Sequence, residues 1–270
     1  MAQQANTSLK LESALRQALG TQELSLYYQP QYLSGKPQLI GFEALIRWHS
    51  EALGFVSPAE FIPVAESTGL IVTLGQWIFH EACQQAAAWF AAGHKNFQIA
   101  VNISSRQLLH HRFLDMINHT LTETGIDPQL IELEITESAF MDNVEYCIET
   151  MYQLRKLGLS LAIDDFGTGY SSLTYLKRFP LNKLKIDQSF IRNLTEESKD
   201  EAIVRNIIDL AKNLELRVIA EGVETEEQRD MLEALGCDEI QGYLMSKPKP
   251  AIDAVQNFPS YLKNRESRHA

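Results

Sequence analysis

Residues 161–173 read LAIDDFGTGYSSL, an apolar run that ends in two adjacent carboxylates and then a glycine-bearing loop. The apolar residues predict a buried β-strand from Leu159 to Ile163, because strands of parallel sheets are apolar throughout. Asp164 and Asp165 fall where that strand stops, and the glycines after them allow the backbone to turn sharply. Neighbouring acids at a strand end repel each other unless a cation lies between them, so this stretch predicts a cation site.

The composition is that of a globular protein long enough for one large core, in one domain or two. The chain has 270 residues, of which 45% are hydrophobic and 22% charged. Its net charge of -11 argues against a nucleic-acid polymer as partner, because phosphate binding needs a basic face. A small anionic substrate remains compatible with this charge if metal ions invert the local field.

Two further features bear on the compartment. The three cysteines, Cys83, Cys147 and Cys237, have neither the spacing of a disulfide framework nor that of a zinc site. No run of residues is apolar enough for a membrane span, and the first thirty residues lack the apolar core of a signal peptide. We therefore expect a cytoplasmic protein with reduced thiols and no membrane insertion of this segment.

Strand-like and helix-like patterns alternate about eight times along the chain. Residues 1–8 are polar and expected to be disordered, the domain is expected over residues 9–258, and residues 259–270 form a tail. A first helix is predicted over residues 9–19. The later helical patterns are 76–92, 105–124, 143–157, 200–214 and 226–235. The strand-like runs are 24–33, 39–48, 97–103, 131–136, 159–163, 181–186, 216–220 and 239–244.

This alternation predicts an α/β fold, specifically a TIM-like (β/α)8 barrel, which has about this length. A doubly wound open sheet is the competing fold. The connection over residues 34–38 is too short for a crossover helix, so one early strand is expected to be antiparallel. The barrel is preferred because polar residues recur within or beside the predicted strands, mostly at their downstream ends, where a barrel would gather them at one mouth. They are Glu43, Asn102, Glu134, Glu137, Asp164, Asp165, Lys185, Asp187, Glu221, Glu224 and Gln241.

Carboxylate and amide oxygens are hard ligands that suit Mg²⁺ or Mn²⁺. The histidines fall outside this set. The excess of carboxylates over the needs of one octahedral ion predicts two ions that share a bridging ligand, for which Asp164 is well placed. Such a pair of ions is typical of phosphoester hydrolysis, in which Lys185 would orient the attacking water and Arg47 would hold a phosphate oxygen.

Simpler structural explanations exist for each residue taken alone. Glu43 and Arg47 lie four apart on a predicted strand, so they could form an internal ion pair. Lys185 could pair with Asp187 or another acid as structural support, and Asn102 could belong to a helix cap. The glycine-bearing loop is weak evidence by itself, because similar loops occur in unrelated proteins.

Nine motifs in order resemble the EAL-domain family of cyclic di-GMP phosphodiesterases, and together they cover residues 9–250. They are YQPQ at Tyr28, FEALIRW at Phe42, FIPVAE at Phe61, VNIS at Val101, ELEITES at Glu132, DDFGTGYSSL at Asp164, LKIDQSF at Leu184, AEGVET at Ala220 and QGYLMSKP at Gln241. The resemblance implies a barrel with one antiparallel strand and hydrolysis of cyclic di-GMP to linear pGpG.

The resemblance also assigns residue roles. It implies one ion held by Glu43, Asn102, Glu134 and Asp164, and a second held by Asp164, Asp165 and Glu221. In this assignment Lys185 activates the water, Gln241 lies near that water, and Glu137 holds the DDFGTGYSS loop. It also implies that Arg47 contacts phosphate and that Gln29 contacts guanine.

Members of the family that lose ligands act as cyclic di-GMP receptors or as partner-binding modules, which is the rival hypothesis. This chain keeps Lys185 and both aspartates, which favours the enzyme. The resemblance further implies a homodimer formed through residues 170–179, and fused or associated sensory or diguanylate cyclase domains.

Overall fold

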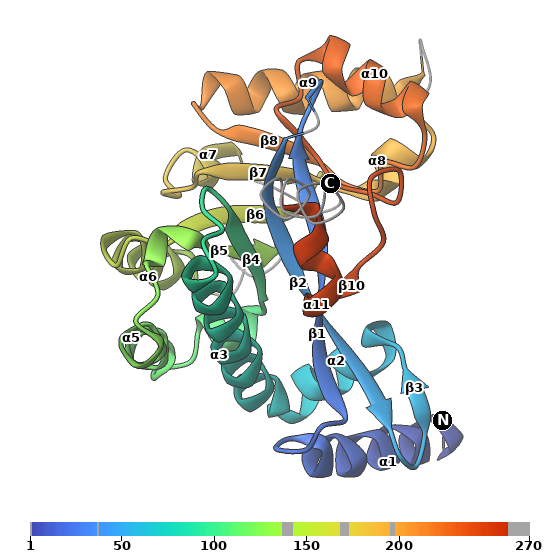
Figure 1. Ribbon diagram of the computed structural model, residues 1–270, viewed down its shortest axis with the longest axis vertical. Helices are drawn as coiled ribbons and strands as arrows, with labels where there is room; N and C mark the ends of the chain where they lie inside the picture. Colours follow the sequence, from blue (N-terminus) through green and yellow to red (C-terminus); the bar gives the residue numbers. More distant parts are fainter. Residues whose placement is uncertain (1, 37, 137–142, 168–172, 195–197, 259–270) are drawn as a thin grey trace, which may run out of the picture.

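The computed structural model describes residues 2–36, 38–136, 143–167, 173–194 and 198–258. Within them, eight strands close into a barrel (Figure 1). The barrel strands are β1 (Leu24–Leu33), β2 (Leu39–Ser50), β4 (Gln98–Ile103), β5 (Ile131–Thr136), β6 (Ser160–Phe166), β7 (Lys183–Ile186), β8 (Arg217–Ala220) and β9 (Glu239–Ile240). Short strands β3 (Gly54–Val56) and β10 (Lys249–Pro250) extend the sheet at its two ends.

The order of the strands confirms the predicted barrel and excludes the open sheet. β1 pairs antiparallel with both β2 and β9, whereas each barrel strand from β2 to β9 runs parallel to the next. β1 is therefore the predicted antiparallel strand. Its reversal follows from the short turn into β2, which leaves no room for a crossover helix.

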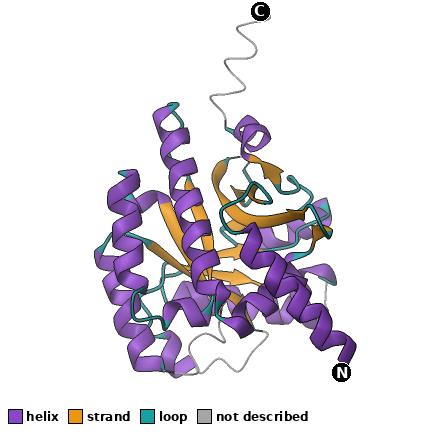
Figure 2. Ribbon diagram, turned by 90° about the horizontal axis from the view of Figure 1, so that it is seen from below, coloured by secondary structure: helices purple, strands orange, loops and turns teal. Residues whose placement is uncertain are grey.

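Helices surround the strands (Figure 2). The longer ones are α1 (Ala2–Ala18), α2 (Pro58–Thr68), α3 (Leu70–Ala91), α5 (Phe113–Thr124), α6 (Val144–Lys156), α9 (Lys199–Asn213) and α10 (Glu226–Leu235). The short ones are α4 (Ser105–Leu108), α7 (Leu173–Leu176), α8 (Gln188–Arg192), α11 (Ala251–Ala254) and the 3-10 turns η1 (Pro128–Leu130) and η3 (Val255–Asn257). No helix among the described residues is both long and apolar enough to cross a membrane.

Several local expectations differ from the structure. Residues 2–8 are helical and continue α1, although we expected them to be disordered; they contain no glycine or proline to stop the helix. The helix predicted over 105–124 is divided into α4 and α5. Helix α2 was not among the helical patterns singled out, and it contains Pro63. The strand predicted over residues 239–244 ends at Ile240, because the chain after β9 turns toward Val223. There Leu244 N donates a hydrogen bond to the Val223 carbonyl.

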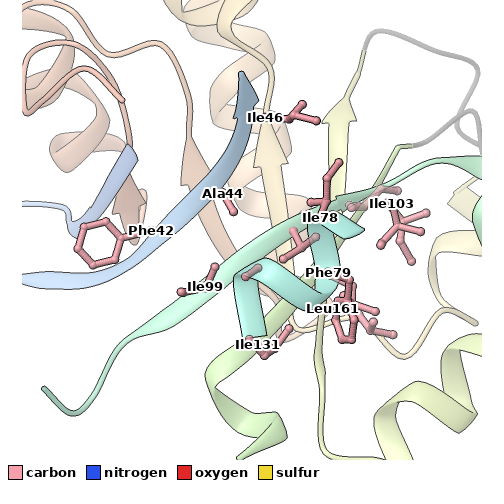
Figure 3. Close-up of a cluster of buried hydrophobic side chains, with 14 of the residues drawn as sticks. Phe42, Ala44, Ile46, Ile78, Phe79, Ile99, Ile103, Ile131 and Leu161 are labelled. Atoms are coloured by element: carbon pink, nitrogen blue, oxygen red, sulfur yellow. The ribbon is translucent and has the colours of Figure 1, made fainter. Parts of the chain in front are cut away.

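The apolar core lies between the outer face of the barrel and the helices. Figure 3 shows Phe42, Ile99 and Leu161, from three strands, on the side that faces α3 and its residues Ile78 and Phe79. Strand side chains alternate between two faces, so the residues between these apolar ones point into the barrel. The outer face therefore supplies the apolar packing and leaves the interior free for polar residues.

The turn after β9 depends on a close approach between two backbones. A Cβ atom on Gly242 would overlap the backbone nitrogen and carbonyl of Val223. We expect Gly242→Ala to lower the free energy of unfolding by about 2 kcal/mol or more, since the backbone must move. Gly125→Ala is the control, because its Cβ would meet nothing within 4 Å and only its positive φ of 63° costs about 1 kcal/mol. Equal losses in urea unfolding would contradict this prediction.

Candidate functional site

The ammonium group of Lys185 lies at the centre of a cluster of acids inside the barrel. Lys185 is on β7 and only 1% exposed. Its Nζ lies 2.6 Å from Glu134 Oε2 and 2.6 Å from Glu221 Oε1. It also lies 3.0 Å from Asp164 Oδ1 and 3.9 Å from Glu43 Oε1. Four acids predicted from separate strand ends thus share one cation.

The side chains of the cluster come from two sets of alternate strands in the barrel. In an eight-stranded barrel, inward side chains from every second strand form a layer. One set comes from β2, β5, β7 and the residue after β9, namely Glu43, Glu134, Lys185 and Gln241. The other comes from β4, β6 and the residue after β8, namely Asn102, Asp164 and Glu221. The predicted convergence of these residues at the carboxyl ends of the strands is therefore observed.

A chain of amide groups fixes Glu43. Gln241 Nε2 donates to Glu43 Oε2 at 2.6 Å, and Asn102 Nδ2 donates to Glu43 Oε1 at 2.7 Å. Gln31 Nε2 in turn donates to Gln241 Oε1 at 2.9 Å. Burial raises the pKa of Glu43, but the charge of Lys185 and these hydrogen bonds outweigh burial and hold the pKa below its ordinary value. Glu43 is therefore held as a carboxylate.

The remaining acids are not fully compensated. Burial, followed by repulsion from neighbouring acids, raises the pKa of Glu134 well above its ordinary value despite Lys185. The same causes raise the pKa of Glu221 to about 8. Glu134 Oε1 is buried and has no hydrogen-bond partner among the described residues. The cluster therefore holds more acids than Lys185 alone can keep ionised, and added cations would favour the ionised forms.

Asp165 reaches the cluster through an irregularity in β6. The pairing of β6 with β7 shifts register between Ile163 and Phe166, and Asp165 has a left-handed φ of 54°. Its backbone nitrogen donates to Asp164 Oδ1 at 2.9 Å. Desolvation, and then repulsion from Asp164, raise the pKa of Asp165 to about 6. The irregularity therefore places two successive acids beside the same site, which regular alternation would prevent.

The donor set fits a hard divalent cation. Its atoms are carboxylate and amide oxygens, and one of them is the unpartnered Glu134 Oε1. Among the described residues, however, no three acids, histidines or cysteines already surround an open point with the spacing of a metal shell. Lys185 Nζ occupies the middle of the cluster, and Asn102 turns its amide nitrogen toward Glu43. Cation binding would therefore require these two side chains to rearrange.

Arg47 lies apart from the acids. Its guanidinium stands 5.4 Å from the ring centre of Tyr27, and Nη1 donates to the carbonyl of Ile46. Among the described residues it forms no ion pair with Glu43, so the simple pairing considered from their spacing is not made. Burial lowers the pKa of Arg47, whereas Tyr243 and Glu43 raise it. This partly buried cation has no carboxylate contact within the described part of the chain, which leaves it available for an anion.

The other predicted residues lie beside the acids or outside the described residues. Gln29 is buried on β1, where its Oε1 accepts from Gln241 Nε2 at 3.2 Å and its Nε2 donates to the Ser246 carbonyl. Asp187 caps α8, where its side chain accepts a hydrogen bond from Ser189 N. Glu137 and residues 168–172 of the glycine-bearing loop are outside the described residues.

Gln31 belongs to the amide network but was not among the predicted site residues. It is 1% exposed and contacts Gln241 across the β1–β9 pairing. The available signal was its spacing from Gln29, because residues two apart on a strand share a face. That signal identifies a shared face but not which face points into the barrel.

Comparison with known proteins places this arrangement in a family. The family model described as the EAL domain matches residues 12–248. A Pseudomonas aeruginosa protein named bifunctional diguanylate cyclase/cyclic di-GMP phosphodiesterase MucR is 44% identical over 247 residues, which are 92% of this chain and 36% of that protein. Escherichia coli cyclic di-GMP phosphodiesterase PdeR is 39% identical over 255 residues, 94% of this chain and 38% of PdeR. The chain thus spans about a third of the length of the curated relatives it matches.

A solved structure is similar to this chain in both fold and sequence. The structure titled PaMucR phosphodiesterase, c-di-GMP complex, superposes with a TM-score of 0.87 at 44% identity and covers 91% of this chain and 99% of that one. The fold prediction is confirmed by this likeness and by the strand order.

The raised pKa of Asp165 leads to a stability prediction. Its pKa of about 6 lies above the ordinary 3.8, so the folded state holds this proton more tightly, and the resulting stability is lost as the pH rises through about 6. We expect Asp165→Asn to raise the melting temperature of the metal-free protein at pH 8 but not at pH 4, since asparagine tolerates the positive φ. The same variant should gain less stability than wild type from added Mn²⁺. Equal stability of both proteins at pH 8 would refute the assigned repulsion.

Proposed function

Because the chain belongs to the EAL-domain family, we propose that it is a metal-dependent phosphodiesterase that hydrolyses cyclic di-GMP to linear pGpG. The observation that carries the proposal is the gathering of Glu43, Glu134, Asp164 and Glu221 around buried Lys185. A cluster with more acids than its one ammonium group can keep ionised favours the cations that phosphoester hydrolysis uses. In this proposal the activity lowers the level of a second messenger in bacterial signalling.

Two ions, Mg²⁺ or Mn²⁺, would be held by the oxygen ligands of the cluster. Glu43, Asn102, Glu134 and Asp164 would hold one, and Asp164, Asp165 and Glu221 the other. When bound, the ions supply Lewis-acid stabilisation of the charge that develops on the phosphoester oxygens. Asn102 would present its amide oxygen in place of the nitrogen that now donates to Glu43.

Lys185 would orient the attacking water as a hydrogen-bond donor. Burial lowers the pKa of Lys185, but Asp164, Glu134 and Glu221 outweigh burial and raise it well above its ordinary value. A group that stays protonated donates hydrogen bonds and stabilises negative charge, so it does not take the proton from the water. Lys185 would therefore act by positioning and charge.

The groups around the cluster would bind the nucleotide. Arg47 would hold a phosphate oxygen, because its guanidinium has no carboxylate partner among the described residues. Gln29 would contact guanine, and Gln241 would lie beside the attacking water while holding Glu43. Glu137 would support the glycine-bearing loop, which follows from the family resemblance alone.

We also propose a cytoplasmic homodimer that works with fused or associated sensory or diguanylate cyclase domains. The support is that the two named relatives are about two and a half times as long as this chain, and one is named for both cyclase and phosphodiesterase activities. The dimer contact would involve residues 170–179, of which 170–172 are outside the described residues.

The primary test is chromatography of cyclic di-GMP after incubation with the purified chain. We expect pGpG to appear with Mg²⁺ or Mn²⁺, and no conversion with a chelator. Ca²⁺ should support the reaction poorly, because it prefers longer bonds and more ligands.

The ligand variant Glu43→Gln should be inactive, whereas Glu201→Gln, which alters a surface ion pair with Arg205, should be fully active. Tight binding without conversion would instead favour a non-catalytic receptor.

The position of Lys185 predicts a link between charge and stability. Lys185→Met leaves three buried acids and the partly buried Glu221 without their cation, so the melting temperature in chelator should fall by several degrees. Mn²⁺ should restore much of this loss, since the ions replace the missing positive charge.

Lys185→Met should also lose turnover more than it loses nucleotide affinity, as measured by kcat and by calorimetry of binding. A variant with wild-type stability in chelator would contradict the central role of Lys185.

A further inference from the structure

A second set of buried ions lies below the site, inside the same barrel. Lys183 Nζ lies 2.9 Å from Glu132 Oε1 and 2.8 Å from Glu239 Oε2. All three side chains are at most 2% exposed. We call Glu132, Lys183 and Glu239 the floor triad. Half-exposed Arg217 donates to Glu239 Oε1 at 2.9 Å. The acidic side chains of Glu132 and Glu239 are therefore paired with the basic side chains of Lys183 and Arg217.

Each member of the floor triad precedes a site residue by two positions. Side chains two apart on a strand point to the same face, so the floor triad lies directly beneath the site. The pairs are Glu132 with Glu134 on β5, Lys183 with Lys185 on β7, and Glu239 with Gln241 at the end of β9. Three strands therefore carry one floor residue and one site residue each.

The ionic contacts join strands that are not neighbours. Lys183 links β7 to β5 and to β9, across the intervening β6 and β8. In the backbone pairing, Ala162 stands opposite both Glu134 and Lys183, yet the ammonium contacts Glu132, two residues earlier. This offset is the stagger that strand tilt imposes on a barrel. The floor triad thus adds direct side-chain contacts between alternate strands, whose backbones are not paired with each other.

Stability alone does not require ions at this position. Buried ion pairs contribute little net stability compared with well-packed apolar residues, because desolvation offsets their attraction. One lysine that contacts two acids at 2.9 Å and 2.8 Å nevertheless ties three strands together through short-range attraction, whereas apolar packing leaves such separations more adjustable. The floor triad is therefore better suited to setting positions than to adding stability.

We propose that the floor triad positions the site: by holding β5, β7 and β9 at a fixed stagger, it sets the separations of Glu134, Lys185 and Gln241. Lys183 is then a positioning residue for cation binding and for turnover. The activity readout rests on the phosphodiesterase function proposed above, whereas the cation-binding readout does not.

The test is the neutral triple variant Glu132→Gln, Lys183→Met, Glu239→Gln, which removes the ionic contacts without leaving an unpaired buried charge. We expect a folded protein in which Mn²⁺ affinity, measured by titration calorimetry, and kcat each fall by about tenfold or more, with little change in KM. The matched control is Leu154→Ala in α6, a buried residue outside the barrel. It should lose at least as much melting temperature as the triple variant and keep wild-type Mn²⁺ affinity and kcat.

A folded triple variant with wild-type Mn²⁺ affinity and kcat would overturn the proposal, as would an equal loss in Leu154→Ala. If the triple variant does not fold, the single variant Glu239→Gln is judged by the same two measurements. If the wild-type chain binds Mn²⁺ but hydrolyses no cyclic di-GMP, the proposed function fails. In that case weaker Mn²⁺ binding by the triple variant still supports the positioning role, and unchanged binding overturns it.

Discussion

The interior of this barrel depends on one electrostatic constraint, the placement of three buried acids and the partly buried Glu221 around the ammonium of Lys185. A cluster of this kind cannot supply the apolar driving force for folding, because burial disfavours each charged group. That driving force comes instead from the outer faces of the strands, where residues such as Phe42 and Leu161 pack against the helices (Figure 3). The alternation of strand side chains thus separates stability from chemistry, with apolar residues outside and ions inside.

The reversed strand β1 contributes to the site in a way that the parallel strands do not. Its pairing with β9 brings Gln31 against Gln241, and Gln241 holds Glu43 on β2. The amide network therefore spans the seam where β1 closes the barrel. Neutral amides suit this position, because they fix Glu43 through hydrogen bonds without adding charge to a cluster that already carries an excess.

Sequence reasoning predicted the fold and most of the candidate site because both are expressed locally. Apolar runs mark buried strands, and Glu43, Asp164 and Glu221 each stand within or just after such a run. It failed where the outcome depends on contacts between distant segments or on small energy differences. The division of the predicted helix at 105–124 was not predicted. The floor triad was not predicted either, because the position of Lys183 two residues before Lys185 does not indicate which acids its side chain contacts.

The amino-acid sequence by itself determined the barrel, its antiparallel strand, the excess of acids at the strand ends and the membership of the EAL-domain family. Only the tertiary structure decided that the ammonium of Lys185 stands between Glu134, Asp164 and Glu221, that the pairing of β6 shifts register at Asp165, and that Lys183 joins alternate strands. The physical reason is the distance along the chain over which each effect acts. Periodicity and turn chemistry act over a few residues, whereas barrel stagger and charge compensation depend on side chains brought together from strands far apart in the chain.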